Sequence, residues 1–208
     1  MVTVVFPGLA PQCDLNSLIL ISVAEAKNGC FCNGSIGELT ELLEKPSAVV
    51  IGPGMLGDES EVPVFKLALK SSSKLVIDAG ALNFVSSYKD LIKNRSDAVV
   101  LTPHSGELKK LASSLGIVSG SRNVAAMISA ELDVIVIEKG QFSRIFSPDG
   151  SVLINPTGCS TLASAGSGDV LSGILGALLS EGSDTKKAVA AGVYIHGLLA
   201  EESSMGIR

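Results

Sequence analysis

The chain has 208 residues, of which 46% are hydrophobic and 18% are charged, and its formal net charge is -5. This length and composition predict one folded domain, spanning residues 1–208, with a large buried core. The acidic balance and the lack of any basic cluster argue against nucleic acid and other polyanions as partners. A small anionic ligand stays compatible with this charge, because backbone N–H groups and single cations can bind it locally.

Four cysteines, at positions 13, 30, 32 and 159, are too few for a disulfide framework, and no leader-like segment precedes them. We therefore expect reduced thiols and a cytoplasmic protein. Cys30 and Cys32 form a C-x-C pair, but a structural zinc site needs two more ligands at suitable spacing, and the chain has only two histidines. We expect no metal bound by these side chains. The apolar runs are much shorter than a bilayer span, which argues against a membrane protein.

Runs of β-branched and apolar residues bounded by Gly, Pro, Asn or Asp predict strands, and apolar residues at helical spacing predict helices. In chain order these are strands over residues 2–6 and 18–22, a helix over 35–44, a strand over 48–52, a helix over 61–70, a strand over 74–78, a helix over 82–93, a strand over 98–101, helices over 106–115 and 124–130, strands over 134–137, 142–146 and 152–154, and helices over 169–179 and 186–201. The alternation predicts a three-layer α/β sandwich, in which a mainly parallel sheet has helices on both faces. The turn Ser147-Pro-Asp-Gly150 predicts that the last two strands form an antiparallel hairpin at the edge of the sheet.

Polar and glycine-rich loops follow most of the predicted strands. Because open parallel sheets bind ligands outside the carboxyl ends of their strands, we expect these loops to converge on one site. They cover residues 52–57, 78–83, 102–107, 139–140 and 166–169.

The segment before the helix over residues 169–179 predicts a phosphate site. Gly166, Ser167 and Gly168 offer backbone N–H groups at the positive end of the helix dipole, without bulky side chains. Asp169 lies in the first turn, where it can act as a base, although Asp is also a common helix cap. Gly173 lies one turn further on the same face. Since Gly inside a helix costs roughly 1 kcal/mol relative to Ala, we expect a ligand or another backbone to approach closely there.

Six motifs appear along the chain in a fixed order. They are Gly52-Pro-Gly-Met-Leu-Gly57, Asp78-Ala-Gly-Ala-Leu-Asn83, Leu101-Thr-Pro-His-Ser-Gly-Glu107, Glu138-Lys-Gly-Gln141, Asn155-Pro-Thr-Gly158 and Ala165-Gly-Ser-Gly-Asp169-Val-Leu-Ser-Gly173. Together they resemble the ADP/ATP-dependent NAD(P)H-hydrate dehydratase family, a branch of the ribokinase-like fold.

The resemblance implies repair of damaged nicotinamide cofactor, by dehydration of NAD(P)HX to NAD(P)H with consumption of ADP or ATP. It implies nucleotide contacts from Lys139, Gly140, Gln141, Phe142, Ser143 and Gly168, and hydrate contacts from Gly57, His104 and Asp169. We add Gly166 and Ser167 to the nucleotide contacts from the predicted phosphate site, and Gly54 to the substrate contacts from the glycine-rich loop over residues 52–57. Asp169 would be the catalytic base, with Asp78, Asn83 and Asn155 as supporting residues. Mg²⁺ is expected with the nucleotide, held mainly by phosphates and water.

The two histidines and Lys139 each have a plainer interpretation. His104 is either a ligand contact or an ordinary loop histidine with a satisfied hydrogen bond, and we favour the contact. Lys139 is either a nucleotide contact or a solvated cation, and again we favour the contact. His196 lies among apolar residues of the last helix, which predicts a packed core residue.

The sequence departs from the family pattern in several places. The family normally begins with a further strand and helix that carry a Gly-Ser-x-Gly-Tyr-Thr-Gly-Ala-like loop, and nothing similar precedes Val2, so we expect a domain that lacks this unit. Gly80, Ser105 and Cys159 stand where Asp, Pro and Asn are usual. The fused epimerase domain is missing too, so an epimerase would be another polypeptide. Family members often form homo-oligomers, which we also expect here.

Two other functions stay open at this stage. A kinase of the same fold, acting on a sugar or a hydroxymethyl-pyrimidine, would use the same phosphate site and the same aspartate. A nucleotide-binding protein without catalysis would keep the fold but lack turnover.

Overall fold

The computed structural model describes residues 1–9, 17–118 and 123–204, so Cys13 lies outside the described residues. Its main sheet has six strands in the order β3-β4-β5-β6-β7-β8. They are Ala48–Ile51, Lys74–Ile77, Val99–Leu101, Ile135–Glu138, Arg144–Phe146 and Val152–Ile154. The first four strands are parallel, and β7 and β8 are antiparallel. The mainly parallel sheet with an antiparallel edge is therefore confirmed.

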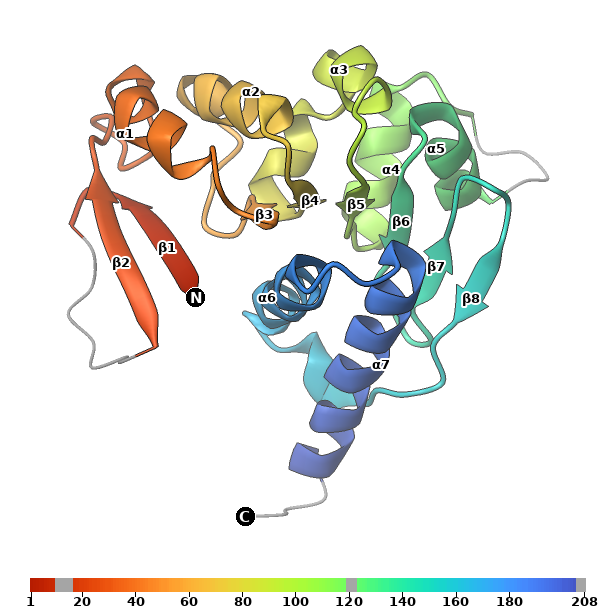
Figure 1. The fold of residues 1–208 in the computed structure, drawn as a ribbon. Helices are drawn as coiled ribbons and strands as arrows, with labels where there is room; N and C mark the ends of the chain where they lie inside the picture. The colour runs from red at the N-terminus through yellow and green to blue at the C-terminus, as the bar shows by residue number, and fades with distance from the viewer. Residues whose placement is uncertain (10–16, 119–122, 205–208) are drawn as a thin grey trace.

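Helices cover both faces of this sheet (Figure 1). One face carries α2 (Val62–Lys70), α3 (Lys89–Lys93), α4 (Ser105–Ser114) and α5 (Val124–Leu132), and the other carries α6 (Ser167–Ser180) and α7 (Thr185–Ser204). This arrangement confirms the three-layer sandwich. No helix among the described residues is both long and apolar enough to cross a bilayer.

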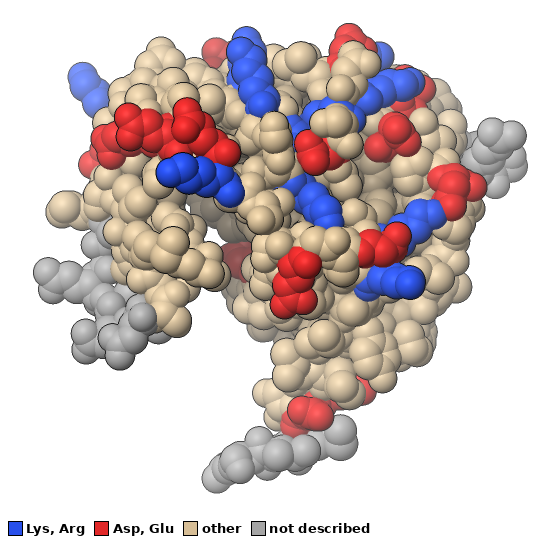
Figure 2. Space-filling model, viewed as in Figure 1, with Lys and Arg blue, Asp and Glu red and all other residues tan. Residues whose placement is uncertain are grey.

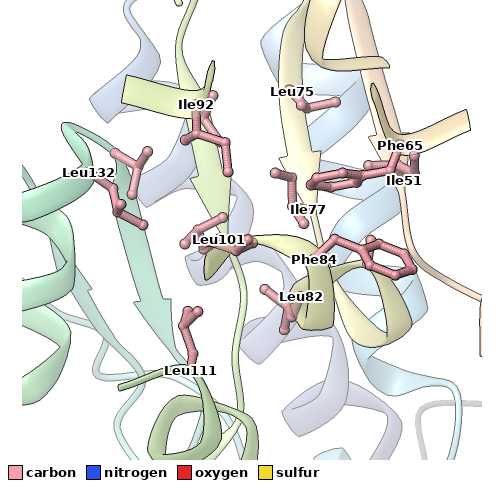
Figure 3. Packing of buried hydrophobic residues seen from close by; sticks show 14 of the residues in the cluster. Ile51, Phe65, Leu75, Ile77, Leu82, Phe84, Ile92, Leu101, Leu111 and Leu132 are labelled. Atoms are coloured by element: carbon pink, nitrogen blue, oxygen red, sulfur yellow. The ribbon is translucent and has the colours of Figure 1, made fainter. Parts of the chain in front are cut away.

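The central strands bury both of their faces. In β4, Leu75 and Ile77 join the apolar cluster under α2 and α4, whereas Val76 joins the cluster under α6 and α7. Figure 3 shows Leu75 and Ile77 within the first cluster. Because side chains alternate across a strand, only a continuous apolar run can serve two buried faces, and this is the pattern from which the strands were predicted.

The first two strands form a separate unit. β1 (Val2–Pro7) pairs with β2 (Leu18–Val23) in a two-stranded parallel sheet of its own. This unit and α1 (Ile36–Leu42) lie at one end of the molecule, beyond β3 (Figure 1). Val5 packs against the main apolar cluster, so the unit is attached through side chains. Both strands were predicted; their separation from the main sheet was not.

The predicted helix over residues 82–93 is wrong in form. Two 3₁₀ segments, over 79–84 and 86–88, precede α3, which is only five residues long. Phe84 and Tyr88 both pack on Phe65, with ring centroids 5.3 and 5.9 Å apart. Leu82, Phe84 and Val85 are all buried. Burial of residues so close together in the sequence favours the tighter 3₁₀ turns over the α-helix that the local pattern predicts.

Candidate active site at the carboxyl edge of the sheet

A hollow of about 450 Å³ opens at the carboxyl ends of β3, β4 and β5. Its walls come from the loop after β3, the 3₁₀ segment after β4 and the start of α4. The lining residues are Met55, Leu56, Ala79, Gly80, Asn83, His104, Gly106, Glu107 and Lys110. Three of the five loops that were predicted to converge therefore meet around one space.

One wall of this hollow is backbone packed on backbone. Gly57 has φ +75°, and a Cβ there would lie 2.2 Å from Asn83 Nδ2 and 2.9 Å from the Gly80 carbonyl oxygen. A Cβ on Gly80 would lie 2.1 Å from the carbonyl oxygen of Met55. The neighbouring Ala79 has φ +44°, a conformation that is strained for a residue with a Cβ. The wall therefore has no room for a side chain at Gly57 or Gly80.

Glu61 holds the turn at Gly57 in place. Its Oε2 accepts hydrogen bonds from the backbone N–H groups of Gly57 (2.8 Å) and Asp58 (3.0 Å), and the residue is buried. A buried carboxylate that accepts two N–H groups fixes a loop firmly, since losing it would leave both donors unpaired. Burial raises the pKa of the neighbouring Cys30 thiol, and the charges of Glu61 and Asp58 raise it further.

His104 is the N-cap of α4. Its Nδ1 accepts hydrogen bonds from the N–H groups of Gly106 (3.0 Å) and Glu107 (3.4 Å), while Glu107 Oε2 accepts from the His104 N–H (2.8 Å). This reciprocal capping box means that the neutral imidazole carries its hydrogen on Nε2. The side chain is 58% exposed and lines the hollow, so His104 has a satisfied hydrogen bond and also faces the space where a ligand would lie.

A buried ion pair joins the hollow to α6. Lys139 Nζ lies 2.8 Å from Asp78 Oδ1, and Ser172 Oγ of α6 donates to Asp78 Oδ2 at 2.7 Å. Lys139 Nζ is also 4.0 Å from Glu107 of the hollow. Burial alone would raise the pKa of the Asp78 carboxyl, but the charge of Lys139 and hydrogen bonds from Lys139, Ser172 and Thr102 together lower it. Asp78 is therefore an anion that holds Lys139 between α4 and α6.

The first turn of α6 carries the residues that were predicted to bind phosphate, and the Ser167 N–H donates to the Ser164 carbonyl at 3.4 Å. Gly166 is the N-cap with φ +84°, and Ser167 Oγ donates to the Leu162 carbonyl at 2.6 Å. A Cβ on Gly168 would lie 3.3 Å from Lys139 Nζ, so the ammonium group sits against this turn. Asp169 is exposed and forms no hydrogen bond or ion pair with another residue in the described part of the chain. Figure 2 shows a hollow on this side of the molecule, between the N-terminal strands and α6.

The predicted nucleotide loop is the turn that connects β6 to β7. Gly140 and Gln141 are exposed, and Ser143 Oγ donates to the Gly140 carbonyl at 3.3 Å. Phe142 has φ +60° and is 58% exposed. An apolar ring held in solvent on a left-handed backbone is available to a flat ligand such as a nucleobase.

Some predicted residues lie neither in the hollow nor at the first turn of α6. Asn155 is buried, and its Nδ2 donates to the carbonyls of Thr157 (2.9 Å) and Val193 (3.3 Å), so it ties the loop before α6 to α7. Gly54, with φ +76°, and Gly57 are not among the residues that line the hollow, although Gly57 packs against Gly80 and Asn83, which do. A Cβ on Gly173 would meet no described atom within 4 Å, so no other described backbone approaches it, and the approach of a ligand there stays a prediction. A Cβ on Gly176 would lie 2.5 Å from Cγ2 of the Val50 side chain.

His196 was predicted as a core residue, and this is wrong. It is only partly buried, and burial lowers the pKa of its imidazole. The charge of Lys139 lowers that pKa as well, whereas a hydrogen bond with the Ser167 backbone raises it. His196 therefore lies beside the start of α6. The apolar residues around it misled the prediction, since Tyr194 and Ile195 are themselves exposed by 46% and 38%.

Three residues of the site were missed. Glu107 follows His104 by three positions, which is the spacing of a capping box and could have been recognised. Lys110 follows Glu107 by three positions on the same helix, so their shared face could also have been recognised. Ser172 gave no signal, because a serine inside a helix usually faces solvent or its own backbone.

The described residues contain no group of three or more His, Cys, Asp or Glu side chains that could hold a metal ion. Cys30, Cys32 and Cys159 are free thiols. Asp78 is already paired with Lys139, whereas Asp169 forms no ion pair with another described residue. This donor set fits a Mg²⁺ ion that takes most of its ligands from phosphates and water.

The layers and the site at the carboxyl edge define an α/β protein of the ribokinase-like class. A ribokinase-like superfamily protein from Enterococcus faecalis has the same fold, with a TM-score of 0.74 at 24% identity over 91% of this chain and 63% of that chain. ADP/ATP-dependent NAD(P)H-hydrate dehydratase from Bacillus subtilis, co-crystallised with ATP/Mg²⁺, matches with a TM-score of 0.72 at 29% identity over 92% of this chain and 65% of that chain.

The chain belongs to the NAD(P)H-hydrate dehydratase family, whose model matches residues 16–205. The bifunctional NAD(P)H-hydrate repair enzyme Nnr of Gloeobacter violaceus is 38% identical over 172 residues, which are 81% of this chain and 33% of that protein. The ADP-dependent (S)-NAD(P)H-hydrate dehydratase of B. subtilis is 34% identical over 77% of this chain and 57% of that protein. The chain thus spans about a third of the first relative and just over half of the second.

Proposed function

We propose that this chain dehydrates hydrated NADH or NADPH at the expense of ADP or ATP. The observation that carries the proposal is Asp169, a carboxylate in the first turn of α6 that forms no hydrogen bond or ion pair with another described residue. It follows Gly168, against which the Lys139 ammonium lies. Family membership supports it, as do the names of relatives that act on the same hydrate.

The hollow and the first turn of α6 suggest where the two substrates bind. Backbone N–H groups of 166–168 and the Lys139 ammonium would hold the terminal phosphates of the nucleotide. The exposed Phe142 and the turn of residues 140–143 would contact its adenosine part. The hydrate would occupy the hollow against the wall that Gly57 and Gly80 form, with the Nε2–H of His104, which lies 3.5 Å from Glu107 Oε1, as a donor.

The reaction then needs one base and one good leaving group. Asp169 accepts the proton of the hydrate hydroxyl while that oxygen bonds to the terminal phosphorus, and the bond from this phosphorus to the departing nucleotide breaks. The phosphorylated oxygen leaves as inorganic phosphate with the electron pair of its C–O bond. The departing phosphate or a water molecule accepts a ring proton, and the electron pair of that C–H bond restores the double bond, which yields NAD(P)H, phosphate and AMP or ADP.

Mg²⁺ bound with the nucleotide would neutralise phosphate charge during this transfer. Asp169 is the carboxylate near α6 that is free to contact a hydrated ion, because Asp78 is held by Lys139 and Ser172. Asp78 would keep Lys139 directed at the phosphates instead.

Three further expectations accompany this function. The relatives named as bifunctional suggest that a second activity, which we expect to be an epimerase acting on the hydrate, accompanies the dehydratase. A homo-oligomer and a cytoplasmic location also stay predictions.

The test is to incubate the purified protein with NADHX or NADPHX and with ADP or ATP plus Mg²⁺, and to follow the absorbance of the reduced nicotinamide. We expect recovery that depends on nucleotide and is abolished in Asp169→Asn. Glu181→Gln, at the other end of α6, is the matched control and should keep full activity. Failure of the wild-type protein to recover either cofactor with either nucleotide would overturn the proposal. Phosphorylation of an added alcohol instead would identify a kinase, and nucleotide binding without any turnover a binding protein.

A further inference from the structure

Lys110 of α4 occupies a position that the proposed reaction leaves unexplained. Its Nζ donates to Asn83 Oδ1 at 2.7 Å, and both residues are exposed. The two side chains line the large hollow and also a smaller one of about 30 Å³ that continues along α4 toward Ser114. The pair therefore stands at the rim of the hollow, where it meets both spaces.

The charged side chains around the hollow differ in whether they already have a partner within the protein. Lys139 is held by Asp78, and Glu107 already accepts from the His104 backbone. Lys110, by contrast, forms no ion pair with any carboxylate of the described residues. An ammonium group has three donors, and Asn83 uses only one of them. Among the described residues, the Lys110 ammonium therefore has no counter-ion, and two of its three N–H donors remain available at the edge of the hollow.

A dinucleotide supplies the group that such a cation binds. The hydrated nicotinamide ring carries no anionic group, so the phosphates are the only strongly anionic part of this substrate. The protein carries a net charge of -5 and places Glu107 inside the hollow, so an anionic substrate needs a local cation to enter. Leu56, which is 67% exposed, offers an apolar surface on another wall for a flat ring.

We propose that Lys110, oriented by Asn83, binds a phosphate group of the dinucleotide substrate and so determines how tightly the hydrate is held. This inference rests on the proposed function and extends it to a substrate contact that the six motifs do not contain. The phosphate is either the pyrophosphate shared by both substrates or the 2′-phosphate found only on NADPHX, and the experiment distinguishes them.

The decisive variant is Lys110→Gln, and its matched control is Lys109→Gln. Lys109 is the adjacent exposed lysine of the same helix, and it lines neither hollow. Its substitution changes the net charge of the protein by the same amount as Lys110→Gln. In Lys110→Gln we expect the KM for hydrate to rise about tenfold, the scale of losing one charge-assisted phosphate contact, while kcat and the KM for nucleotide stay unchanged. Added salt should raise the KM for hydrate of the wild type and the control, and should affect Lys110→Gln much less.

Each outcome has a definite meaning. An equal rise for NADHX and NADPHX assigns Lys110 to the pyrophosphate, and a rise for NADPHX alone assigns it to the 2′-phosphate. An unchanged KM for both substrates, or an equal rise in the Lys109 control, overturns the inference. Calorimetric titration of all three proteins with NADH and NADPH tests the Lys110 inference separately from the proposed function. Weaker binding of these dinucleotides by Lys110→Gln can be measured even if the wild type shows no turnover.

Discussion

Replacing Asp78 with Asn should destabilise the fold in a measurable way. Asp78 is 1% exposed and accepts hydrogen bonds from Lys139 and Ser172 at 2.8 and 2.7 Å. Asn keeps the shape of the side chain but removes its charge, so Lys139 loses its closest counter-ion. Removing one partner of a buried pair typically costs about 3–5 kcal/mol.

The cost here should be smaller. Lys139 is 20% exposed and has Glu107 at 4.0 Å, so solvent and a second carboxylate offset part of the loss. We therefore expect Asp78→Asn to lower the free energy of unfolding by about 2 kcal/mol. For a chain of this length that corresponds to a fall in Tm of about 4–8 °C. Because the chain has no tryptophan, urea and thermal unfolding should be followed by far-ultraviolet circular dichroism.

The effect should also depend on pH. The pKa of the Asp78 carboxyl is lowered from its ordinary value of 3.8 in the folded protein, so the unfolded chain binds the proton more readily. Its contribution is therefore complete above about pH 4 and is lost as pH falls through the lower folded value. The difference in unfolding free energy between wild type and Asp78→Asn should shrink as the solution is acidified below pH 4.

Asp149→Asn is the control for a surface pair. The pKa of Asp149 is lowered to about 2 by hydrogen bonds with Lys186 and Ser151, but its side chain is 57% exposed. Solvent screens such a pair, so we expect no measurable loss of stability. The reasoning would be refuted if Asp78→Asn unfolded at the same urea concentration as the wild type, or if the Asp149 variant lost as much.

Three further substitutions test individual contacts. Glu61→Ala leaves the N–H groups of Gly57 and Asp58 without their acceptor and should cost about 2–3 kcal/mol in urea unfolding; a neutral result would mean that water replaces the carboxylate. Gly173→Ala should raise the unfolding free energy by about 1 kcal/mol, because a Cβ meets no described atom there, and destabilisation would contradict this. Gly57→Ala should raise the KM for hydrate, since its Cβ displaces Asn83 from the wall; unchanged kinetics would show that the hydrate binds elsewhere.

Local pattern predicted most of the strands and helices, because apolar runs in a doubly buried sheet and apolar spacing in helices are visible along the chain. The prediction of a helix over residues 82–93 was wrong because Phe84 and Tyr88 are placed by packing on Phe65, which belongs to another helix and is not adjacent in the sequence. His196 failed for a similar reason, as neighbouring apolar residues do not reveal which face of α7 is covered.

The site was predicted as a set of loops but not as a set of contacts. The rule for parallel sheets placed Asp78 and Lys139 at the same edge. That they pair across 61 positions of the chain depends on the order of the strands, which pattern alone does not give. The role proposed for Lys110 likewise depends on the residues around it, because its spacing from Glu107 indicates a shared helix face but not that this face borders the hollow.

The glycine wall of the hollow limits how this protein can change. Gly57 and Gly80 press main chain against main chain, so random mutagenesis should leave them almost invariant among active variants. A library that seeks a new substrate preference gains little from that side. Diversity is better directed to Lys110 of α4, whose side chain is exposed and lines the hollow.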